Sequence, residues 1–125
     1  MADVVLDASA VLAVLQDEPG ADEVWDHLPG AGLSAVNAAE VAAKLVDGGA
    51  PPEDASEILE RLGMTILPFD AVDIVPSARI SHASRALSLG DRACLSLAMR
   101  LEVPAVTADR AWAELSTDLD IQLIR

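Results

Sequence analysis

Four acidic residues, far apart in the sequence, each lie at the end of a strand-like apolar segment or near the start of a helix-like one. They are Asp7, Glu40, Asp91 and Asp109. A carboxylate beside an apolar segment is costly to desolvate, so four of them in such places predict a shared partner. Carboxylate oxygens suit a hard divalent cation such as Mg²⁺, which usually keeps several of its waters. A water-carrying metal held by acids indicates phosphodiester chemistry.

Each of these acids also has a simpler interpretation. Any one of them could be a helix N-cap or a first-turn acid that the helix dipole favours. Glu40 lies four residues before Lys44 and could form an ion pair with it along a helix. The four acids taken together are much harder to explain in this way.

The elements that must position these acids alternate along the chain. Strands are expected at residues 4–6, near Leu33, and at 64–67, 103–107 and 121–124, and helices at 9–15, 21–28, 36–46, 52–62, 70–87 and 92–101. Strands that are apolar throughout and separated by helices are typical of a parallel sheet covered on both faces. We therefore expect an α/β fold of three layers, α/β/α, with a central parallel sheet. Ligands bind at the carboxyl ends of such strands, where Asp7 and Asp109 would lie and where Glu40 and Asp91 would begin their helices.

Length and composition limit the classes of protein. A chain of 125 residues is expected to form a single domain, residues 1–125. Its net charge of −13 has the wrong sign for binding nucleic acid over a broad basic surface. One cysteine, Cys94, excludes an internal disulfide and agrees with a reducing compartment. The sequence contains no signal-like leader and no apolar run of about 18 residues, so we expect a cytoplasmic protein without a membrane span.

Four segments around the acids resemble the motifs of a known family. These segments are residues 4–10 (VVLDASA), 37–41 (NAAEV), 87–95 (LSLGDRACL) and 106–110 (VTADR). They resemble the PIN-domain ribonucleases, and most closely the bacterial VapC toxins of type II toxin–antitoxin modules. The resemblance spans almost the whole chain in the right order. It implies a PIN-like α/β/α sandwich, dependence on Mg²⁺ or Mn²⁺, endonucleolytic cleavage of RNA, and neutralisation by a VapB-type antitoxin.

The resemblance also implies roles for individual residues. Asp7, Glu40, Asp91 and Asp109 match the acidic quartet of the family without a departure. We expect Asp7 and Asp91 to be the main metal ligands, Asp109 a third or second-metal ligand, and Glu40 an outer ligand through water. Without metal, crowded carboxylates cannot all ionise easily, so at least one should have a raised pKa.

Two hydroxyl residues stand next to the acids in the sequence. Ser9 and Thr107 each lie two residues from a quartet aspartate and could orient a carboxylate or a water. They could equally be ordinary capping hydroxyls.

Basic residues are few but unevenly spread. Residues 74–90 contain no acid but include Arg79 and Arg85, and Arg92 and Arg110 directly follow quartet aspartates. These four arginines could form a cationic rim that holds an RNA backbone beside the metal site. They could instead be solvated surface residues.

Two other classes of protein compete with the nuclease interpretation. A metal-dependent phosphatase of another α/β family, the haloacid dehalogenase type, also begins with an aspartate after its first strand, but it needs a second aspartate where this chain has Ser9. A non-catalytic acidic interaction domain is the other alternative, and an intact quartet argues against it. Under the nuclease interpretation we expect an RNA substrate, an antitoxin partner and a homodimer.

Overall fold

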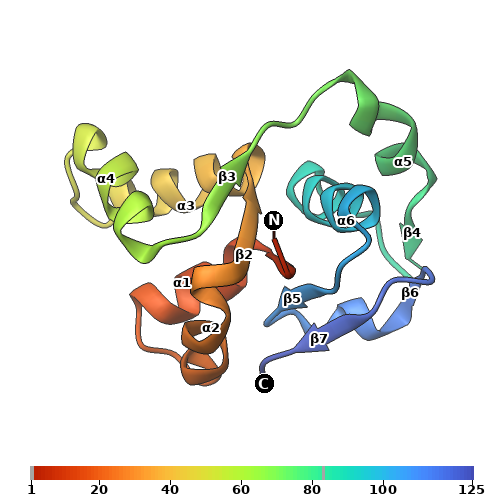
Figure 1. Ribbon diagram of the computed structural model, residues 1–125, viewed down its shortest axis with the longest axis horizontal. Coiled ribbons are helices and arrows are strands. Elements are labelled where there is room, and N and C mark those ends of the chain that lie inside the picture. Colours follow the sequence, from red (N-terminus) through yellow and green to blue (C-terminus); the bar gives the residue numbers. More distant parts are fainter. Residues whose placement is uncertain (1, 83) are drawn as a thin grey trace.

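A five-stranded parallel sheet forms the centre of the protein. The computed structural model describes residues 2–82 and 84–125. The strands are β1 (Val4–Leu6), β2 (Ala31–Ser34), β3 (Thr65–Leu67), β5 (Ala105–Thr107) and β7 (Ile121–Leu123), in the spatial order β3-β2-β1-β5-β7. Every neighbouring pair is parallel. The first strand is thus the central one, between β2 and β5 (Figure 1).

Helices cover both faces of this sheet. Successive side chains of a strand point to opposite faces, and β1 serves one core on each side. Val4 and Leu6 pack in a cluster with α1 (Ala8–Leu15), α2 (Ala21–His27) and α3 (Ala35–Asp47), whereas Val5 packs with α6 (Leu89–Leu101). Figure 1 accordingly shows α1 and α2 on one side of β1 and α6 on the other. The expected three-layer α/β/α architecture with a central parallel sheet is confirmed.

Most helices begin where capping chemistry predicts. The Ser34 hydroxyl accepts a hydrogen bond from the Val36 amide (3.3 Å) at the start of α3. Helix α4 (Pro52–Leu62) starts with a proline, whose missing N–H is not needed in a first turn. It ends at Gly63, whose φ of 91° is left-handed.

The prediction of one long helix over residues 70–87 is wrong. The chain there forms a 3₁₀ turn, η2 (Ala71–Asp73), the short helix α5 (Ile74–Arg79), and strand β4 (Ser81–His82), which pairs antiparallel with β6 (Leu115–Ser116). Arg92 explains where α5 ends, because its guanidinium donates to the carbonyls of Ser77 (2.6 Å) and Ile80 (2.8 Å). Part of the expected helix, Ala83, lies outside the described residues.

Helix α6 begins three residues earlier than the sequence indicated. Ser88 and Asp91 form a capping box, in which each side chain accepts from the other's backbone amide (Asp91 N to Ser88 Oγ 3.1 Å, Ser88 N to Asp91 Oδ2 3.3 Å). Two more 3₁₀ turns, η1 (Leu28–Gly30) and η3 (Arg110–Glu114), complete the fold. Within the described residues, no helix is both long enough and apolar enough to cross a membrane.

Candidate active site

All four acidic residues line one cavity of about 210 Å³. Asp7 follows β1, Asp109 follows β5, and Glu40 and Asp91 come from the first halves of α3 and α6. The cavity therefore lies at the carboxyl ends of the central strands, as the sequence predicted. Its other lining residues are Ala8, Ser9, Leu12, Asn37, Lys44 and Gly90.

Hydrogen bonds hold the Asp7 carboxylate from three sides. Asp7 is the N-cap of α1, and its Oδ1 accepts from the Ala10 amide (2.9 Å) and the Ser9 hydroxyl (2.7 Å). Its Oδ2 accepts from the Thr107 hydroxyl (2.7 Å). Ser9 and Thr107 accept in turn from the amides of Ala108 (2.9 Å) and Asp109 (3.0 Å). The two hydroxyls therefore fix the Asp7 carboxylate relative to the loop that carries Asp109.

Burial sets the acidity of this group. Asp7 is only 6 % exposed, and this burial raises its pKa from 3.8 to about 6, although the hydrogen bonds from Thr107, Ser9 and Ala10 oppose the rise. The charge of Asp91 raises the pKa further, but it is the smallest contribution. A raised pKa was expected from crowding of the carboxylates; desolvation is the main cause.

Asp91 and Asp109 each cap the start of a helix, and both also line the cavity. Asp91 belongs to the capping box of α6, and Asp109 is the N-cap of η3, where its Oδ1 accepts from the Ala111 amide (3.0 Å). Arg85 lies between them, 2.7 Å from Asp109 Oδ2 and 3.8 Å from Asp91 Oδ2. The hydrogen bond to Asp109 raises the pKa of the Arg85 guanidinium. Capping and clustering thus coexist in these residues.

Glu40 is held differently from the other acids. It is exposed, and its Oε1 accepts from Asn37 Nδ2 at 3.0 Å. No ion pair joins it to Lys44 among those found in the described part of the chain. Lys44 instead lines the same cavity as an additional cation.

The donor set fits a hard cation such as Mg²⁺ or Mn²⁺. Four carboxylates surround one cavity, and the Arg85 guanidinium already places a positive charge between two of them. Within residues 2–82 and 84–125, however, no three acidic, histidine or cysteine side chains stand close enough together to hold one ion. Asp91 and Asp109 both lie next to the Arg85 guanidinium, with which a cation would compete for these carboxylates.

The other three arginines of the expected cationic rim lie away from the quartet carboxylates. Arg92 binds the carbonyls at the end of α5. Arg110 Nε donates to the Arg125 carbonyl (3.1 Å), and Arg79 lines a separate hollow with Met99 and Glu102. Among the four, Arg85 is the one that the structure brings to the quartet.

Asn37 and Gly90 are site residues that the sequence reasoning missed. Asn37 is 1 % exposed, and its Nδ2 donates to Glu40 Oε1 and to the Gly90 carbonyl, both at 3.0 Å. A Cβ on Gly90 would overlap with the Glu40 carboxylate. The available signal was the spacing of three between Asn37 and Glu40, which places both on one face of a helix.

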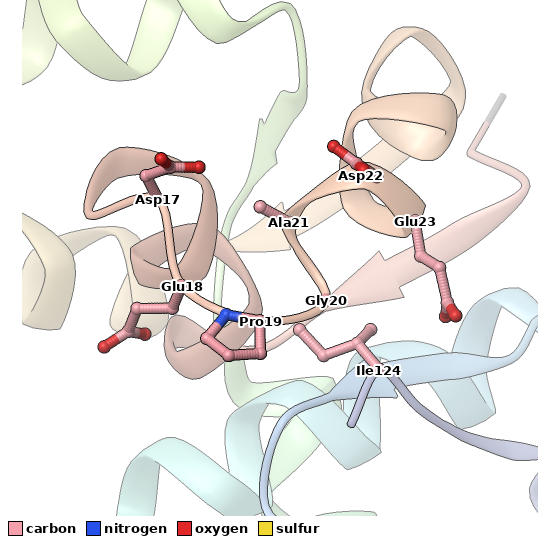
Figure 2. A pocket seen from close by; sticks show the side chains of 8 residues that line it. All are labelled: Asp17, Glu18, Pro19, Gly20, Ala21, Asp22, Glu23 and Ile124. Atoms are coloured by element: carbon pink, nitrogen blue, oxygen red, sulfur yellow. The ribbon is translucent and has the colours of Figure 1, made fainter.

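Another hollow lies between α1 and α2 and differs from the quartet cavity in how its acids are arranged. Its lining includes Asp17, Glu18, Asp22 and Glu23, together with Ile124 near the C-terminus. Figure 2 shows these four carboxylates pointing in different directions instead of converging. Arg125 contacts this loop through Glu18 Oε1 (3.5 Å) and the Pro19 carbonyl (2.9 Å). The hollow therefore lacks the convergent acids of the quartet cavity.

Comparison with known proteins identifies one family model that matches the chain. The model is described as PIN domain, and it matches residues 4–117. No curated protein is significantly similar to the chain.

Solved structures share the fold over nearly the whole chain. A toxin–antitoxin complex from Klebsiella pneumoniae has a chain with a TM-score of 0.74 and 12% identity, and the match covers 98% of both chains. DNA-bound VapBC from Salmonella typhimurium gives a TM-score of 0.74 at 14% identity over 100% of both chains. VapC20 from Mycobacterium tuberculosis, described as a Sarcin-Ricin loop cleaving toxin, gives 0.67 at 16% identity over 88% of this chain and 92% of its own. At such low identities the likeness establishes the fold alone.

Proposed function

Because this chain belongs to the PIN domain family, we propose that it is a metal-dependent endoribonuclease toxin that a VapB-type antitoxin neutralises. The observation that carries the proposal is the meeting of Asp7, Glu40, Asp91 and Asp109, from four different elements, around one cavity. Residues 1–125 would form a single PIN domain. Structural neighbours that are toxins in complex with antitoxins support the toxin assignment.

The proposed chemistry assigns each acid a task. Asp7, Asp91 and Asp109 would hold Mg²⁺ or Mn²⁺ directly, and Glu40 would act at its outer side through water. The bound metal would supply an activated water and neutralise charge on the phosphate in the transition state. Ser9 and Thr107 keep the Asp7 carboxylate in one orientation, since each donates to one of its oxygens.

Arg85 is the best placed of the arginines proposed to bind RNA. Its guanidinium lies beside two of the proposed metal ligands, and guanidinium groups suit phosphate oxygens. If Asp91 and Asp109 hold the metal, the Arg85 guanidinium would be free to contact the RNA backbone. The other predicted RNA contacts have less support, because none of them is paired with a quartet carboxylate in the described part of the chain. They are Arg79, Arg92 and Arg110.

The competing functions are less well supported by the site. A phosphatase of the haloacid dehalogenase type needs an aspartate at the position of Ser9, whose hydroxyl is used here to hold Asp7 and the Ala108 amide. A non-catalytic interaction domain leaves unexplained why a buried carboxylate with a raised pKa is retained at the cavity.

The proposed partner is a small basic antitoxin segment. A net charge of −13 and an acidic cavity would speed encounter with such a segment, and an inserted Arg or Lys could bind the quartet carboxylates. The homodimer expected from the resemblance also remains part of this proposal.

Expression in bacteria tests the toxin function directly. The chain expressed alone should arrest growth, and co-expression of its neighbouring gene should relieve the arrest and yield a co-purifying complex. The Asp7→Asn variant should not be toxic. If the chain expressed alone does not arrest growth and purifies without a partner, the toxin and antitoxin parts of the proposal fail and only the nuclease part remains.

Arg85→Gln should weaken the capture of RNA. Loss of one phosphate contact to a single strand should reduce the slope of log kcat/KM against log salt concentration by about 0.7. Mn²⁺ affinity should not fall, because Arg85 competes with the ion for Asp91 and Asp109. Arg61→Gln is the matched control, since Arg61 is exposed on α4 and pairs with Glu57. Equal salt slopes in the two variants would mean that Arg85 does not contact the RNA backbone.

A further inference from the structure

Asn37 makes two contacts that join α3 to the first turn of α6. Its Nδ2 donates to Glu40 Oε1 on its own helix and to the carbonyl of Gly90, 53 positions along the chain, both at 3.0 Å. Gly90 directly precedes Asp91. One amide group therefore sets the position of Glu40 relative to the turn that carries another quartet acid.

The orientation of this amide is determined by its neighbours. Both nearby groups are oxygen acceptors, so only the NH₂ side of the amide can face them. The Asn37 Oδ1 is then buried, and it finds no hydrogen-bond partner among the described residues. A buried acceptor without a partner destabilises a fold. An apolar side chain would pack here without that cost. We therefore infer that the role of the Asn37 amide is to donate its two hydrogen bonds.

Gly90 leaves room for the Glu40 carboxylate beside the first turn of α6. A Cβ at this position would overlap with the Glu40 carboxylate, so the close approach depends on glycine. Glycine inside a helix is unfavourable relative to alanine. Two residues that each lower stability thus meet at the same carboxylate.

We propose that Asn37 and Gly90 are positioning residues that hold the Glu40 carboxylate at the cavity that Asp7 and Asp91 also line. This inference rests on the proposed function, and it adds two residues through which Glu40 acts. Both are expected to affect the reaction only through Glu40.

The variants Asn37→Leu and Gly90→Ala test this role. Leucine has nearly the shape of asparagine and removes the unpartnered acceptor, and alanine favours the helix, so neither should lower the melting temperature. Both should reduce kcat for RNA cleavage about 10- to 100-fold with little change in KM, because small misplacement of an active-site group has effects of this size. Ser96→Ala replaces a buried polar residue on α6 that does not line the cavity; it is the control and should retain kcat.

The same substitutions in a Glu40→Gln background decide whether the effect passes through Glu40. We expect them to add no further loss there, since residues that act as one unit are not additive. A full additional loss in that background, or unchanged kcat in both single variants, would overturn the inference. Unchanged kcat in Glu40→Gln itself would overturn it as well.

Two further measurements do not depend on cleavage. Mn²⁺ affinity, measured by electron paramagnetic resonance, should fall in Asn37→Leu but not when Glu40 is already Gln. The side-chain amide resonances of Asn37 should shift in Glu40→Gln and in Gly90→Ala; resonances that stay in place would overturn the contact. Failure of the nuclease proposal would appear separately, as an unmodified protein that cleaves no RNA in Mn²⁺.

Discussion

Asp91→Asn is expected to abolish metal-dependent cleavage of RNA while leaving the fold intact. Asparagine keeps an oxygen that can accept from the Ser88 amide, so the capping box of α6 is preserved. It removes the negative charge that would bind the metal. Loss of such a ligand should lower the rate about 1000-fold, which corresponds to about 4 kcal/mol of transition-state stabilisation.

The measurement is cleavage of a fluorescently labelled RNA in Mn²⁺, with chelator as the blank and circular dichroism as the check of folding. Asp54→Asn is the matched control, because it removes the same charge from an exposed position on α4. A fully active Asp91→Asn protein would remove this residue from the site and the metal mechanism with it.

Asp7→Asn should make the metal-free protein more stable at pH 8 but not at pH 4. The folded-state pKa of Asp7 is raised from 3.8 to about 6, so its ionisation opposes folding. This destabilisation is complete above about pH 6 and disappears as the pH falls toward 4. The difference in pKa corresponds to at most about 3 kcal/mol. The observed increase in the free energy of unfolding should be smaller than this, because the NH₂ group of asparagine cannot accept a hydrogen bond from Thr107 or Ser9.

Urea unfolding in the presence of chelator at pH 8, 6 and 4 gives the free energy of unfolding at each pH. The difference between Asp7→Asn and the unmodified protein should decline steadily over this range. Asp22→Asn, an exposed acid near the start of α2, should show no such decline. A difference that does not vary with pH would mean that the Asp7 carboxylate is not desolvated in the folded state.

The sequence was sufficient to predict the sheet edge at which the acids meet. Asp7 and Asp109 follow apolar strands, and the carboxyl ends of parallel strands share one edge whatever their order. The capping hydroxyl of Ser34 and the proline at 52 likewise act within one turn of their own helices, so local chemistry determines them.

Contacts between distant segments determine the features that were not predicted. Helix α5 ends where Arg92, twelve positions from Ile80, binds its carbonyls. The same contact occupies the guanidinium of Arg92, so its predicted contact with RNA has less support than that of Arg85. The bridge from Asn37 to Gly90 depends on how α3 packs against α6, and no local pattern encodes that packing.

The central place of β1 has a consequence for the timing of synthesis. Asp7 takes one of its hydrogen bonds from Thr107, 100 positions later in the chain, and β5 must pair with β1 before that bond can form. At a translation rate of about 5–20 residues per second, the ribosome needs roughly 5 to 20 s to make the intervening segment. A nascent chain therefore carries an incomplete site until Thr107 has been made and β5 has paired with β1.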